Sequence, residues 1–128
     1  MVPVELLEVL RAKVNDGVLA PWTQWWDEDD VAPMFPDQRT RVAASAEQPR
    51  LPLAYYEQSI PVPAVWDAAP CAYLFFGPPY DELAADALDR GWSVREVPGL
   101  HLHQLVDPDG VTETLIDTAR HFSARENG

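Results

Sequence analysis

Two of the chain's three histidines lie close together in the run "REVPGLHLHQLVDPDGV", residues 95–111. His101 and His103 follow a Pro-Gly turn and precede a helix-start signal at Asp107. An imidazole can take up and release a proton near neutral pH. The run therefore indicates acid–base chemistry on a loop between a strand and a helix.

The elements around this loop follow the order strand, helix, strand, helix. The run "CAYLFF", residues 71–76, is continuously apolar, which is typical of a strand buried on both faces. Residues 78–91 indicate a helix, residues 92–97 a second strand, and Asp107-Pro108 the start of a last helix. This order implies parallel strands, and two strands alone suggest one end of a larger sheet.

A carboxylate is expected to face the histidine loop. In open α/β sheets, functional groups gather at the carboxyl ends of the strands. A side chain from loop 77–81 could therefore meet His101, and Asp81 is the first candidate, with Glu82 the second. The acid would set the tautomer of the imidazole, while the other ring nitrogen takes a proton. The alternative is that Asp81 simply stabilises the start of a helix.

Residues 71–120 resemble the C-terminal portion of an α/β-hydrolase, and "PGLHLHQLVDPDGV" is similar to the loop and helix start that carry its catalytic histidine. The segment "QPRLPLAYYEQSIPVP" resembles the return path from the cap of esterase-like members, including those akin to hydroxynitrile lyases. The resemblance covers about residues 48–120. It implies attack on an apolar ester or thioester, with His101 as general base and then acid and Asp81 orienting it.

The nucleophile of that family is missing from this sequence. It sits in a G-x-S-x-G turn between strand and helix, and none of the four serines has such flanking glycines. The acid loop "GPPYDE" is also unusual in its two prolines. The chain thus resembles a truncated hydrolase, or a fragment of one. Ester hydrolysis by a serine route would need a partner chain that carries the missing half.

The first part of the chain resembles a cap. Residues 4–14 indicate an amphipathic helix, and residues 20–70 hold eight of the 13 prolines and four of the five tryptophans. Proline biases the residue before it away from helix, so only a weak helix is expected there, over 37–48. The predicted fold class is α/β: a partial α/β-hydrolase-like fold with a short parallel sheet, flanking helices and a Pro/Trp-rich cap-like segment. Residues 1–70 form the helical or irregular cap-like region, and 71–128 form a βαβα unit.

Aromatic residues of the cap-like region suggest an apolar substrate pocket. The alternatives are a core made irregularly from large side chains, or a surface that meets a missing domain. The candidate substrate-binding residues are Trp22, Trp25, Trp26, Tyr55 and Tyr56, together with His103 from the histidine loop.

The composition narrows the range of partners. The net charge is −12 with one lysine, which disfavours nucleic acid and anionic membranes, since phosphate neutralisation needs clustered cations. Neither a membrane-spanning run nor a signal peptide is evident, so a cytoplasmic location is expected. The lone Cys71 indicates a reduced, buried thiol. No cofactor is expected, and no metal, because His101 and His103 lack a clear third ligand.

Two other functions fit the same residues. A histidine in an aromatic pocket can move protons in an isomerisation, dehydration or cyclisation without any serine. Alternatively, the chain is a non-catalytic binding or assembly module, whose exposed sheet edge pairs with a second copy or with a partner chain.

Overall fold

The computed structural model describes residues 3–126, and the chain divides into two compact units, residues 1–63 and residues 64–128. The sequence patterns place the division slightly later, between residues 70 and 71. We call the two parts the N-terminal unit and the C-terminal unit.

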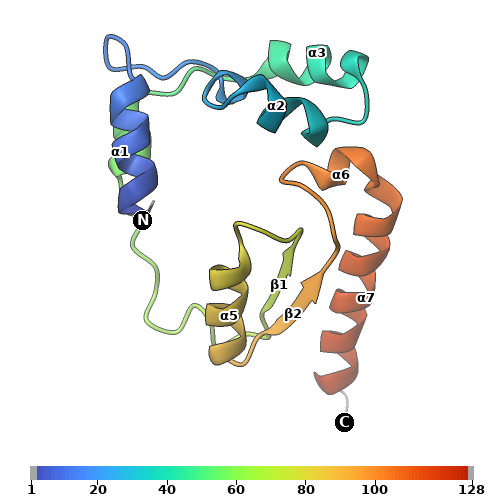
Figure 1. Cartoon of the computed structure of the whole chain (residues 1–128). Helices are drawn as coiled ribbons and strands as arrows, with labels where there is room; N and C mark the ends of the chain where they lie inside the picture. The colour runs from blue at the N-terminus through green and yellow to red at the C-terminus, as the bar shows by residue number, and fades with distance from the viewer. Residues whose placement is uncertain (1–2, 127–128) are drawn as a thin grey trace. The chain divides into compact units, whose positions relative to one another are not determined.

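The N-terminal unit is helical. It contains α1 (Val4–Lys13), α2 (Glu28–Val31), α3 (Gln38–Glu47) and α4 (Leu53–Glu57), with 3-10 turns at Trp22–Gln24 and Ala32–Met34 (Figure 1). A carboxylate oxygen of Asp37 accepts a hydrogen bond of 2.7 Å from the backbone N–H of Thr40, which caps the start of α3. The helices expected over 4–14 and 37–48 are confirmed, whereas α2 and α4 are too short for sequence periodicity to reveal.

A small apolar core holds the N-terminal unit together. Leu10, Leu19 and Trp25 form its buried centre. Partly buried apolar side chains pack around them: Leu6, Val14, Trp22, Leu53 and Tyr56. The backbone N–H of Leu19 donates to the carbonyl of Leu51 over 2.9 Å, which ties the segment after α1 to the segment before α4.

The C-terminal unit is a two-stranded parallel sheet with helices. Its elements are β1 (Ala72–Phe75), α5 (Asp81–Asp89), β2 (Ser93–Glu96), α6 (His103–Val106) and α7 (Pro108–Glu126). The strands pair in parallel, with Ala72 opposite Ser93 and Phe75 opposite Glu96. Helices α5 and α7 lie on either side of the strand pair (Figure 1). The expected α/β class, with a short parallel sheet and flanking helices, is therefore confirmed.

Local signals set the ends of these helices. Gly91 has a positive φ of 77°, which favours glycine, and follows the end of α5. A carboxylate oxygen of Asp107 accepts from the backbone N–H of Gly110 over 3.0 Å, and Pro108 is the first residue of α7.

The expectation of full burial for residues 71–76 is wrong. Ala72 is exposed and the rest of β1 is half-buried, because a sheet of two strands provides little cover.

The longest helix, α7, has 19 residues, and it carries charged side chains such as Asp109 and Glu113 along its length. Across residues 3–126, no helix combines the length and the apolar character that crossing a bilayer requires. On α7, Val111 is buried, whereas Leu115 and Ile116 are exposed.

Candidate acid–base site

Two loops meet at the carboxyl edge of the sheet. The loop after β1 turns at Gly77, whose φ is +102°, and the N–H of Tyr80 donates to the carbonyl of Gly77 over 3.1 Å. The loop after β2 returns to the same edge, because the N–H of Gly99 donates to the carbonyl of Phe76 over 2.9 Å. The parallel pairing expected from the sequence thus places these loops side by side.

Tyr80 is the side chain of the first loop that contacts His101. The phenolic oxygen of Tyr80 and Nδ1 of His101 form a short hydrogen bond. The two rings also stack, with centroids 5.7 Å apart and planes inclined by 25°. Tyr80 is half-buried, whereas His101 is exposed. Tyr80 carries no catalytic motif in the sequence, although it directly precedes the candidate acid Asp81.

Partial burial favours the neutral forms of both rings. It lowers the pKa of His101 from the ordinary value of 6.5. It also raises the pKa of Tyr80, with the nearby phenol of Tyr73 as the smaller cause. A neutral imidazole is the form that accepts a proton, so the pair is suited to general base catalysis at neutral pH.

The acidic candidates occupy the start of a helix. Asp81 and Glu82 are the first two residues of α5, and both are exposed. The free N–H groups of a first helical turn favour nearby carboxylates. Their positions match the alternative that they stabilise the helix start, and the role of Asp81 as the acid partner of His101 stays a prediction.

His103 lies beside the pair and packs on an aromatic ring. It is the first residue of α6 and is half-buried, with its ring centroid 5.5 Å from that of Phe76 and the planes inclined by 59°. Gly99 leaves room for this imidazole. A Cβ atom at position 99 would stand 2.8 Å from Cβ of His103 and closer still to two ring atoms.

Gly99→Ala is therefore expected to destabilise the C-terminal unit by about 1–3 kcal/mol, the usual cost of overpacking. The clash involves Cβ of His103, so a rotation of the ring alone cannot relieve it. Urea unfolding of Gly99→Ala, His103→Ala and the double variant measures the coupling between the two positions. The penalty of Gly99→Ala should shrink in the His103→Ala background, and an unchanged penalty would contradict this packing.

The lowered pKa of His101 also predicts how stability depends on pH. Because the folded-state pKa lies below the unfolded value, the unfolded chain binds more protons between the two. The contribution of His101 to stability is thus present above the unfolded pKa and is lost as the pH falls through the folded pKa. Between about pH 7.5 and about pH 5, the wild type should lose more unfolding free energy than His101→Gln. Equal losses in urea titrations of the two proteins would count against a partly buried imidazole.

The candidate substrate-binding aromatic residues all belong to the N-terminal unit. Trp25 is only 6% exposed, and its indole N–H donates to the carbonyl of Ala20 over 2.7 Å. Tyr56 meets Trp25 edge to face, with ring centroids 5.5 Å apart. Trp25 therefore occupies the core, and Tyr56 packs against it, in agreement with the alternative of a core made from large side chains.

The other three aromatic candidates differ in exposure. Trp22 is half-buried and packs against the same core. Trp26 is 38% exposed and Tyr55 is 61% exposed. Trp26 and Tyr55 are accordingly the members of the predicted set with the most surface available to a ligand.

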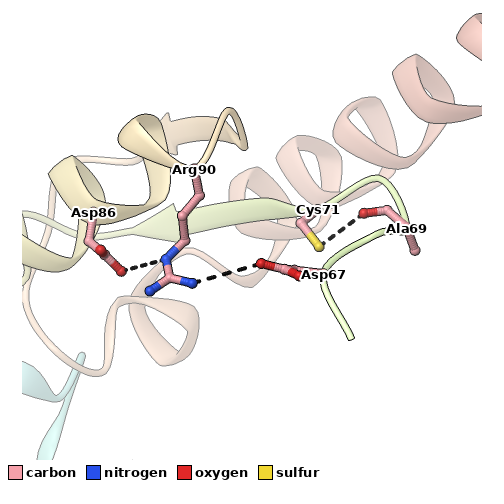
Figure 2. Close-up of polar contacts among 5 residues, drawn as sticks. All are labelled: Asp67, Ala69, Cys71, Asp86 and Arg90. Atoms are coloured by element: carbon pink, nitrogen blue, oxygen red, sulfur yellow. Dashed lines mark hydrogen bonds and ion pairs between the residues drawn. The ribbon is translucent and has the colours of Figure 1, made fainter. Parts of the chain in front are cut away.

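A separate hollow of about 280 Å³ lies near the amino ends of β1 and β2, and neither Tyr80 nor His101 lines it. Arg90 lines this hollow. Figure 2 shows its guanidinium paired with Asp86, over 2.8 Å, and with Asp67, over 3.8 Å. Cys71 donates from its thiol to the carbonyl of Ala69 over 3.2 Å. The expected burial of Cys71 is wrong, because this residue precedes β1 and is only partly covered.

Comparison with models of known protein families, with curated proteins and with solved structures found no match to this chain. Among the side chains that the structure describes, residues 3–122, His, Cys, Asp and Glu form no group of three or more that could hold a metal ion. The chemistry of the candidate site is therefore argued from its own residues, which are an imidazole, a phenol and the aromatic rings beside them.

Proposed function

We propose that the C-terminal unit moves protons on a small, largely apolar molecule, with His101 as the acid–base residue and Tyr80 as its positioning partner. The observation that carries the proposal is the hydrogen bond between the Tyr80 hydroxyl and Nδ1 of His101, formed at the shared carboxyl edge of two parallel strands. This edge is where α/β proteins commonly place functional groups.

The hydrogen bond orients the imidazole for either direction of transfer. When Nδ1–H donates to the phenolic oxygen, Nε2 carries the lone pair that accepts the substrate's proton. The imidazolium that results keeps its Nδ1–H bond to that oxygen, and the proton on Nε2 is the one that it can deliver. The same pair thus supplies a base and then an acid, which is the sequence that an isomerisation requires.

The reaction that fits is a shift of a double bond next to a carbonyl group. Nε2 removes a proton from the carbon beside the carbonyl, the C–H electron pair moves to form an enolate, and the imidazolium returns the proton to another carbon. No electrons are gained or lost, so no redox cofactor is needed. Loss of a hydroxyl group as water, a dehydration, is the variant in which the proton goes to oxygen.

Two measurements test this proposal. In deuterated water, the wild-type protein should speed the incorporation of deuterium into members of a series of small unsaturated ketones, relative to buffer alone, as followed by proton NMR. Exchange at the buffer rate for every ketone of the series would contradict the activity. Independently, nitrogen NMR should show one dominant tautomer of His101 in the wild type and a mixture in Tyr80→Phe. Identical tautomer ratios would contradict the positioning role of Tyr80.

A relationship to the C-terminal portion of α/β-hydrolases is our second proposal. Three features support it: adjacent parallel strands, a histidine on the loop after the second strand, and a following helix that begins at Pro108 with Asp107 as its cap. Ester chemistry would then require a serine from a partner chain that completes the sheet. A fluorophosphonate probe should leave this chain unlabelled when it is tested alone, and labelling would contradict the lack of an activated serine.

A further inference from the structure

A second hollow, with both polar and apolar side chains in its lining, lies between β2 and α7. It has a volume of about 40 Å³, and it is lined by Ser93 and Arg95 from the strand and by Thr118, His121 and Phe122 from the helix. Ser93 and Arg95 are two residues apart, so they project from the same face of β2. The space exceeds that of one water molecule and suits a small charged group.

Arg95 is exposed, and among the described residues it shares the lack of an ion pair with Arg39 and Arg50. Four others pair with carboxylates: Arg11, Arg41, Arg90 and Arg120. Within the described part of the chain, no carboxylate forms an ion pair with Arg95, although the chain carries a net charge of −12. A guanidinium presents a planar fork of N–H donors that matches the two oxygens of a carboxylate or phosphate.

The polar side chains that α7 contributes to this hollow form hydrogen bonds within the helix. Nδ1 of His121 donates to the carbonyl of Asp117 over 2.8 Å, which fixes the orientation of the ring. The hydroxyl of Thr118 donates to the carbonyl of Thr114 over 2.7 Å, so the hydroxyl proton already has a hydrogen-bond acceptor. Glu96, the next residue of β2, projects from the opposite face of the strand.

We propose that this hollow binds a small oxyanion, a carboxylate or phosphate group, with Arg95 as its principal ligand and the Ser93 hydroxyl as a second donor. Phe122 covers one side and reduces competition from water. The site is separate from the Tyr80–His101 pair, and the proposal does not depend on the function assigned to that pair.

Titration of the full chain with sodium phosphate, and separately with sodium acetate, tests the proposal at constant ionic strength. Saturable amide NMR shifts at Ser93, Arg95 and Thr118 are expected with at least one of the two anions. Arg95→Gln should weaken binding by about 10-fold or more, since it removes a charge-assisted fork. The matched control is Arg50→Gln, an exposed arginine of the N-terminal unit, which should bind as the wild type does.

The outcomes distinguish a carboxylate ligand from a phosphate ligand, and specific binding from non-specific binding. Saturation with acetate alone assigns a carboxylate, and saturation with phosphate alone assigns a phosphate. Shifts that grow linearly with both anions, or equal weakening in Arg95→Gln and Arg50→Gln, would overturn the site. If the NMR spectrum shows that Arg95→Gln is unfolded, the same titration is made with Arg95→Lys, which keeps the positive charge but lacks the planar guanidinium. Reduced anion affinity in Arg95→Lys supports the proposal, and unchanged affinity refutes it.

Discussion

Replacing His101 with glutamine is expected to lower the proton-transfer rate by about 10²- to 10⁴-fold, the range that general acid–base catalysis supplies. Glutamine has a similar reach but cannot accept a proton at neutral pH. His101 is exposed on a loop, so the variant should fold like the wild type. Deuterium exchange into the best ketone of the series gives the rate, and a circular dichroism spectrum verifies the fold.

Two neighbouring substitutions separate the partner observed in the structure from the partner expected from the sequence. If Tyr80 orients the imidazole, Tyr80→Phe should reduce the rate and alter its pH profile, whereas Asp81→Asn should have little effect. The reverse ranking would restore Asp81 as the acid partner. Gln104→Ala, an exposed change on α6, serves as the matched control and should leave the rate unchanged. Full activity in His101→Gln would end the proposal.

Leu10→Ala should destabilise the N-terminal unit by about 2–5 kcal/mol, which is the range measured for truncating a buried leucine. Leu10 is completely buried and packs in the cluster that contains Leu19 and Trp25. Removing three of its carbons loses apolar burial and leaves a cavity that the short helices can only partly close. Urea unfolding followed by tryptophan fluorescence measures the loss.

The neighbouring residue provides the control for this prediction. Val9 lies on the same helix and is 37% exposed, so Val9→Ala removes less buried surface. It should cost clearly less than Leu10→Ala. Equal losses would show that the helix, rather than the core around Leu10, limits the stability of the unit.

Elements with strong local signals were predictable from the sequence. Asp107 with Pro108 marks the start of α7, and Gly91 marks the end of α5, because capping and left-handed glycine act over a few residues. The apolar run 71–76 predicted β1 and the more polar run 92–97 predicted β2. Their separation by a helix predicted the parallel pairing. The short helices α2, α4 and α6 lack the length at which periodicity becomes visible.

The roles of the aromatic residues were less predictable. A tryptophan in a Pro-rich segment fits a ligand pocket and a core equally well, because both are apolar. The structure resolves this choice for Trp25, which is buried and hydrogen-bonded within the N-terminal unit. Arg95 carried no signal either, since whether an arginine has a carboxylate partner depends on residues that are distant in the chain.

By itself, the sequence determined that a histidine loop follows the second of two parallel strands, because strand and helix signals are local. Only the tertiary structure decided which side chain of the "GPPYDE" turn contacts His101. The turn at Gly77 places Tyr80 at its end and Asp81 at the first position of α5. Tyr80 and Asp81 are adjacent in the chain, but the backbone directs their side chains differently, and this backbone geometry cannot be read from the sequence.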